Sequence, residues 1–80
     1  MTKGYLLVYT TSCAFYCEEL MKPVKGMVVK LVPTPREYSS DCGIAVYFEY
    51  EFPKTLEELL QKHHLEYELK LLSTISDHPF

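Results

Sequence analysis

The chain has 80 residues, of which 48% are hydrophobic and 24% charged, the balance of an ordinary folded domain. Eight basic and eleven acidic residues give a formal charge of −3. The basic residues are scattered, which argues against nucleic acid as a partner because binding it depends on clustered lysines and arginines. No apolar segment approaches the roughly 20 residues of a membrane helix, and the N-terminus lacks the regions of a signal peptide. We therefore expect a cytoplasmic protein with no membrane partner.

The first half of the chain predicts a strand, a helix and a second strand. Tyr5–Tyr9 is rich in strand-forming residues, and the threonines and serine after it can cap a helix. The helix should end near Met21 or Lys22, because a proline and a glycine follow closely. A strand at 27–32 with a single charge is expected at an edge of the sheet. One helical stripe should face the core: Cys13, Cys17, Leu20 and Val24, widened by Tyr16 and Met21.

The second half predicts a strand, a helix and a strand. Residues 44–52 alternate, and the inward set should be Ile44, Val46, Phe48, Tyr50 and Phe52. Pro53 suits the first turn of a helix, where its missing N–H costs nothing. The inner face of that helix should be Leu56, Leu59, Leu60 and His63. Residues 65–71 alternate cleanly and predict the last strand. We expect one domain over 1–72 and a frayed tail over 73–80.

This order of elements is the split βαβ, or ferredoxin-like, arrangement of the α+β class. It predicts a four-stranded antiparallel sheet with spatial order four, one, three, two and both helices on one face. We expect the third strand to run parallel to the first, which would place its start at the end of the sheet where both helices finish. The helix start with Cys13 and Cys17 would then lie at the opposite end. The open face is predicted to carry a homodimer surface of Tyr5, Leu7, Tyr9 and Tyr47.

The loop from Pro33 to Gly43 separates two strands and reads Pro-Thr-Pro-Arg-Glu-Tyr-Ser-Ser-Asp-Cys-Gly. Its two prolines stiffen the first half. Cys42 is either a small apolar residue that opens a strand or an exposed thiol on a rigid loop. If both helices end beside this thiol, their dipoles raise its pKa, and compensation must come from Arg36 or from His63 or His64.

The other two cysteines, Cys13 and Cys17, lie one helical turn apart. Two thiols could hold a soft metal, but core packing explains this pair better, because the spacing differs from that of metal carriers of this fold. With an odd number of cysteines and no framework spacing, the sequence predicts reduced thiols rather than disulfides. We therefore expect no metal and no cofactor.

The loop sequence, from Pro33-Thr34-Pro35-Arg36-Glu37 to Ser39-Ser40-Asp41-Cys42-Gly43-Ile44-Ala45, resembles the selenium/sulfur carrier protein-like family of small bacterial domains. The resemblance extends over nearly the whole chain, although helix one departs from the family pattern at Cys13, Tyr16, Cys17 and Pro23. It implies that Cys42 is the carrier cysteine and that the accompanying loop residues are Arg36, Ser39, Ser40 and Asp41.

Two hypotheses follow. In the first, the protein is a carrier rather than a turnover enzyme: Cys42 accepts sulfur or selenium from a donor protein and passes it to an acceptor. Arg36 would favour the thiolate, Ser39 and Ser40 would donate hydrogen bonds, and the adjacent Asp41 would oppose ionisation unless it turns away. In the second, the protein is a homodimeric binding or regulatory module in which Cys42 is structural.

Overall fold

The computed structural model describes residues 1–38 and 43–72, and these form four strands and two helices. In chain order they are β1 (Thr2–Val8), α1 (Thr11–Met21), β2 (Val28–Pro33), β3 (Ile44–Tyr50), α2 (Pro53–Lys62) and β4 (Tyr67–Leu71). The predicted order of elements is confirmed. Strand β1 begins earlier than predicted and β4 begins later, while the predicted tail at 73–80 lies outside the described residues.

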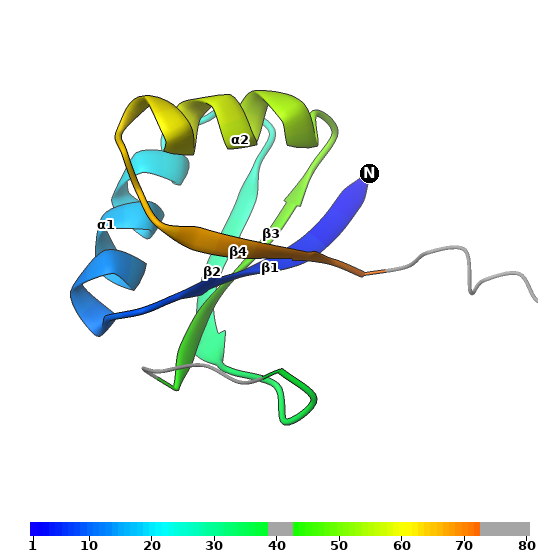
Figure 1. Ribbon diagram of the computed structural model, residues 1–80. Coiled ribbons are helices and arrows are strands. Elements are labelled where there is room, and N and C mark those ends of the chain that lie inside the picture. Colours follow the sequence, from blue (N-terminus) through cyan, green and yellow to red (C-terminus); the bar gives the residue numbers. More distant parts are fainter. Residues whose placement is uncertain (39–42, 73–80) are drawn as a thin grey trace, which may run out of the picture.

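The four strands form one antiparallel sheet with the order β2-β3-β1-β4 (Figure 1). This is the predicted spatial order, and with two helices it confirms the α+β fold class. Strands β1 and β3 are central, so each is paired on both sides, whereas β2 and β4 are the edge strands.

The predicted direction of β3 is wrong, because β3 pairs with β1 in antiparallel register. Leu7, near the end of β1, faces Ala45, near the start of β3. The β2–β3 loop therefore lies at the end of the sheet where β1 finishes and α1 begins. Helix α2 ends there as well, since β4 follows it and Tyr67 pairs with Val8. The first turn of α1, with Cys13, thus lies at the same end as the loop and not at the opposite one.

The core lies between one face of the sheet and both helices. Alternate residues of β1 and β3 form the sheet side, and the helix side comes from three residues of α1 and two of α2: Leu6, Val8, Val46 and Phe48; Ala14, Cys17 and Met21; Leu56 and Leu60. These side chains are almost completely buried. The predicted inner faces of β3 and α2 thus form much of this core. Phe52 is an exception, with 56% of its surface exposed, because β3 ends before it.

Helix α1 is rotated relative to the predicted stripe. Ala14 and Met21 are fully buried with Cys17, whereas Leu20 is only half-buried and Tyr16 is exposed. Its first turn is capped by Thr10, whose Oγ1 accepts a hydrogen bond from the Cys13 N–H at 3.1 Å. Apolar side chains occur all round this helix, so the spacing alone did not define one inner face.

Gly4 on β1 is required by the close approach of both neighbouring strands, β3 and β4. A Cβ atom at this position would lie 2.7 Å from the carbonyl oxygen of Lys70 and 3.1 Å from the ring of Phe48. The Phe48 ring therefore covers the backbone of β1 where a side chain would otherwise stand.

Within residues 1–38 and 43–72, neither helix has the length and hydrophobicity that crossing a bilayer requires.

Candidate functional site

The β2–β3 loop is closed at its base by the backbone. The Thr34 N–H donates to the Gly43 carbonyl at 3.0 Å, one step beyond the last strand pair, Pro33 with Ile44. Gly43 has a φ of 71°, a left-handed conformation that glycine adopts without strain. The base of the loop thus continues the hairpin, and the residue that follows Cys42 in the sequence is held by a hydrogen bond.

A tight turn follows in the first half of the loop. The Tyr38 N–H donates to the Pro35 carbonyl at 3.0 Å, so Arg36 and Glu37 are the two central residues of a β-turn. Both are exposed. Pro35 is the first residue of this turn, and its ring fixes its own φ.

Tyr38 anchors the loop to the sheet face opposite the helices. Its ring packs edge-on against Tyr5 with centroids 6.0 Å apart, and Tyr5 in turn contacts Tyr47 at 5.5 Å. Lys70 Nζ lies 5.9 Å from the centre of the Tyr38 ring. Tyr47, Tyr5 and Lys70 are direct cross-strand neighbours on β3, β1 and β4. We call Tyr5, Tyr38, Tyr47 and Lys70 the tyrosine cluster.

The tyrosine cluster bears on the homodimer surface that the sequence predicts for the open face of the sheet. Sequence reasoning assigned Tyr5, Leu7, Tyr9 and Tyr47 to a dimer surface, but Leu7 is only 4% exposed in the single chain. Tyr5 is covered in part by Tyr38. In Figure 1 the loop lies below β1 and β4, while α2 lies above them. The homodimer stays a prediction, with less apolar area available to it than the sequence suggested.

One short hydrogen bond on this face joins Tyr47 and Glu49. The Tyr47 hydroxyl donates to Glu49 Oε2 at 2.6 Å, and this bond raises the pKa of Tyr47 to about 12, with some contribution from burial. A tyrosine held in this way keeps its proton throughout the physiological range, so Tyr47 contributes packing and a fixed hydrogen bond rather than acid–base chemistry.

The predicted site residues are distributed as follows. Arg36 lies in the exposed turn of the loop. His63 closes the C-terminus of α2, and its Nδ1 is 3.5 Å from the hydroxyl of Tyr16 on α1. It therefore packs on the helix side of the sheet, whereas Tyr38 packs on the other side. Four predicted site residues lie outside the described part of the chain: Ser39, Ser40, Asp41 and Cys42.

The two cysteines of α1 are held by packing. Cys17 is fully buried, and this burial, followed by the neighbouring Cys13, raises its pKa to about 12. Cys13 is half-buried, with its Sγ 3.9 Å from the Glu66 carbonyl oxygen. Within residues 1–38 and 43–72, no three His, Cys, Asp or Glu side chains gather closely enough to hold a metal ion.

A small apolar depression lies beside the base of the loop. It has a volume of about 250 Å³ and is lined by residues from the end of β2 and the start of β3: Leu31, Val32, Pro33, Gly43 and Ile44. Sequence reasoning missed both this depression and the anchoring role of Tyr38. The available signal was that Tyr38 is the only aromatic residue in an otherwise polar loop.

Together these features define a small α+β domain of the ferredoxin-like type, in which the loop of the β2–β3 hairpin is closed at its base and anchored through Tyr38. Residues 3–69 match the family described as "Putative Se/S carrier protein-like", and the chain belongs to that family. This match confirms the family that the loop sequence indicated. Comparison with curated proteins found no match, and neither did comparison with solved structures.

Proposed function

We propose that this protein carries sulfur or selenium as a covalent adduct of Cys42. The observation that carries the proposal is the family match over residues 3–69, which includes the whole β2–β3 loop and its cysteine. The loop also suits the role in its described parts, because its base is closed by the hydrogen bond from Thr34 to Gly43 and its turn is anchored through Tyr38.

The chemistry is an exchange at a sulfur–sulfur or sulfur–selenium bond. The Cys42 thiolate attacks the terminal sulfur of a donor persulfide, R–S–SH, and the donor leaves as the thiolate R–S⁻. One S–S bond forms as another breaks, so Cys42 carries a persulfide and no oxidant is consumed. With a donor of the form R–S–SeH, the same step gives Cys42–S–SeH. An acceptor thiolate then attacks the terminal atom and regenerates the Cys42 thiolate.

The neighbouring loop residues are assigned by charge and hydrogen-bonding capacity. Arg36 favours the thiolate and the anionic adduct, and Ser39 and Ser40 donate hydrogen bonds to them. Asp41 opposes ionisation unless its carboxylate bonds to the loop backbone instead. We assign His63 a structural role, since its contact is with Tyr16 on the helix side of the sheet.

The two cysteines of α1 are less suited to carry sulfur or selenium than a cysteine in the loop. A nucleophilic thiol must be accessible and at least partly ionised near neutral pH. Cys17 fails on both counts, because it is fully buried and its pKa is raised to about 12. Cys13 is half-buried against the start of β4. Burial therefore argues against Cys17 as the carrier, and the contact of Cys13 with the Glu66 carbonyl favours a packing role for it. Both observations support our choice of Cys42.

The apolar depression beside Gly43 is the proposed contact for the donor and acceptor proteins. A volume of about 250 Å³ accommodates one apolar side chain of a visiting protein. Such a contact would orient the partner at the base of the loop before the exchange, in the way that apolar pockets fix interface anchors.

The proposal is tested by measuring the intact mass after incubation with glutathione persulfide or glutathione selenopersulfide. We expect wild-type protein to gain one sulfur or one selenium atom, and a Cys42→Ser variant to gain none. A Cys13→Ser variant, matched in chemistry, should still be loaded. Iodoacetamide titration should give a reactive pKa below the roughly 8.5 of a free thiol. An unreactive Cys42 that gains no mass would refute the carrier role and favour the binding module.

A further inference from the structure

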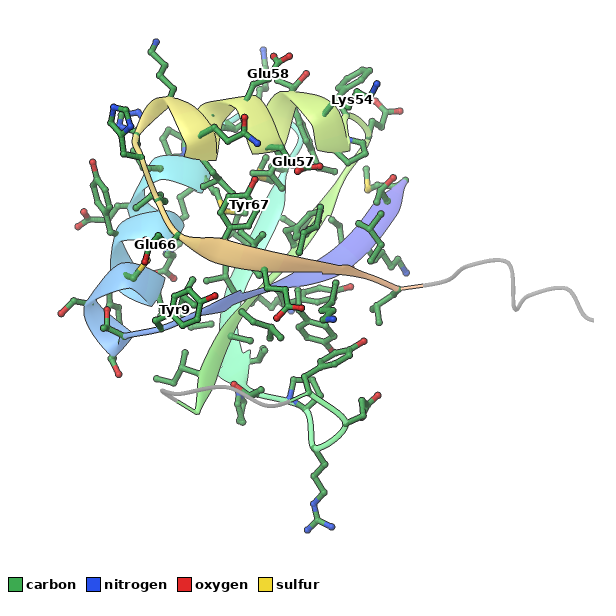
Figure 2. The ribbon with its side chains drawn as sticks, in the orientation of Figure 1. Tyr9, Lys54, Glu57, Glu58, Glu66 and Tyr67 are labelled. Atoms are coloured by element: carbon green, nitrogen blue, oxygen red, sulfur yellow. The ribbon has the colours of Figure 1, made fainter. Side chains whose placement is uncertain are left out.

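A second feature of the molecule, separate from the loop, is a groove of about 760 Å³ along strand β4. Its lining comes from the end of β1, from α2 and from the chain at β4: Tyr9; Glu57 and Gln61; Leu65, Glu66, Tyr67, Glu68 and Leu69. Figure 2 shows Glu57 and Tyr67 between α2 and β4, and Tyr9 and Glu66 near the start of β4. Because five consecutive residues line it, the groove follows the edge of the strand rather than one of its faces.

This edge carries backbone groups with no strand beside them among the described residues, since β4 ends the sheet order. The Leu72 N–H donates to the Lys3 carbonyl at 2.8 Å, so Leu72 is hydrogen-bonded to β1. In an antiparallel pair of strands, only every second residue of β4 makes hydrogen bonds to β1. The register then directs the N–H and C=O groups of Tyr67, Leu69 and Leu71 away from β1. Such a row is a template for pairing with another extended chain.

The charge of the groove is one-sided. Three carboxylates line it, those of Glu57, Glu66 and Glu68, and no lysine or arginine does. Glu57 accepts a hydrogen bond from the Tyr67 hydroxyl at 3.4 Å, which fixes it at the groove wall. Glu68 is paired with Lys70 at 2.9 Å, but Glu68 is exposed and Lys70 only half-buried, so the pair is weak. The acidic balance of the whole chain reinforces the local negative potential.

We propose that the edge of β4 binds an extended, lysine- or arginine-bearing segment of a partner protein as a fifth strand. Backbone hydrogen bonds to the alternate residues of β4 would give the affinity, and basic side chains would face Glu57 and Glu66. This site does not involve Cys42, so it stands or falls independently of the carrier chemistry.

A partner of opposite charge fits better than a second copy of this chain. Two copies pairing through β4 in a closed dimer would bring two sets of the same groove carboxylates together, and like charges in an interface are costly. Pairing β4 of one copy with β2 of the next is a head-to-tail contact, which propagates unless rotation closes a ring. A basic segment of another protein avoids both problems.

The probe is an acetylated and amidated heptapeptide of alternating lysine and valine, titrated into the full-length protein and followed by amide chemical shifts. We expect saturable shifts concentrated at residues 65–71 and at Gln61, with residues 28–33 of the other edge unchanged. A peptide with glutamate in place of lysine should not bind. A peptide methylated on every backbone nitrogen should not bind either, because it has no N–H to offer β4 from either of its edges.

Matched protein variants distinguish the effect of the groove carboxylates from that of the overall negative charge of the protein. Glu57→Gln and Glu66→Gln should each weaken peptide binding about twofold to fivefold. Glu58→Gln is the control, since Glu58 points away from the groove on the outer side of α2 (Figure 2) and should leave binding unchanged. The proposal is overturned if the methylated peptide binds as well as the parent, if the control variant weakens binding equally, or if the β4 shifts depend only on protein concentration.

Discussion

Replacing Tyr38 by alanine tests whether the tyrosine cluster holds the β2–β3 loop against the sheet. The change removes the edge-on contact with Tyr5 at 6.0 Å and the contact with Lys70 at 5.9 Å. An aromatic pair of this geometry contributes about 0.5–1.5 kcal/mol, and an exposed cation–π contact about 0.5–1 kcal/mol. Together they stabilise the closed loop by about 1–2.5 kcal/mol, so we expect the alanine variant to open about 5 to 70 times more often.

The assay uses the single arginine of the chain. Arg36 is the only arginine in the sequence and lies in the turn that Tyr38 closes, so an arginine-specific protease cuts only there. When opening is fast relative to cleavage, the cutting rate follows the open population. We expect Tyr38→Ala to be cut about 5 to 70 times faster than wild type, and Tyr38→Phe, which keeps the ring contacts, to be cut at nearly the wild-type rate. Equal rates for wild type and Tyr38→Ala would refute the anchoring argument.

Three further predictions concern the stability of the domain. Gly4→Ala should lower the free energy of unfolding by about 1–3 kcal/mol in a urea titration, because the new Cβ would lie 2.7 Å from a backbone oxygen and 3.1 Å from the Phe48 ring; an unchanged midpoint would contradict this packing. Thr10→Ala should cost about 1 kcal/mol by removing the cap of α1, whereas Thr10→Ser should keep most of it; equal losses in the two variants would exclude the cap. Above pH 9 the unfolded state loses the Cys17 proton, while the folded state keeps it up to about pH 12. The free energy of unfolding should therefore fall by up to about 1.4 kcal/mol per pH unit in this range. A Cys17→Ala variant should show a shallower decrease of stability with alkaline pH.

The strands and α2 could be predicted because their patterns are local and unambiguous. Alternation in β3 identified Val46 and Phe48 as core residues, and Pro53 marked the start of α2. Both signals lie within a single element, so the sequence of that element alone is enough to show them. The family could be predicted for a related reason, since the loop sequence around Arg36 is distinctive and continuous along the chain.

Helix α1 was predicted less well because its apolar residues do not define a single side. Phe15 and Tyr16 are large aromatic residues, yet they are 50% and 42% exposed. The small residue Ala14 is fully buried, as are Cys17 and Met21. Which of these residues faces inward is decided by how α1 packs against the sheet, and the sequence pattern of the helix alone carries no record of that packing.

The direction of β3 could have been obtained from connectivity alone. A right-handed crossover makes β2 parallel to β1, and a hairpin makes β3 antiparallel to β2, so β3 must oppose β1. The return of Tyr38 to the sheet is different. It depends on contacts with Tyr5 and Lys70, which lie far from Tyr38 in the sequence, and no local pattern predicts them.

The hydrogen bond from Thr34 to Gly43 has a practical consequence for engineering this domain. The pairing register of β2 and β3 does not depend on the segment beyond this bond, because all their residue pairs, up to Pro33 with Ile44, lie on the sheet side of it. Lengthening a surface loop costs little, about 0.6 kcal/mol for each doubling. Peptides grafted between Tyr38 and Gly43 should therefore leave the scaffold folded, which makes this hairpin a suitable display position for reporter sequences.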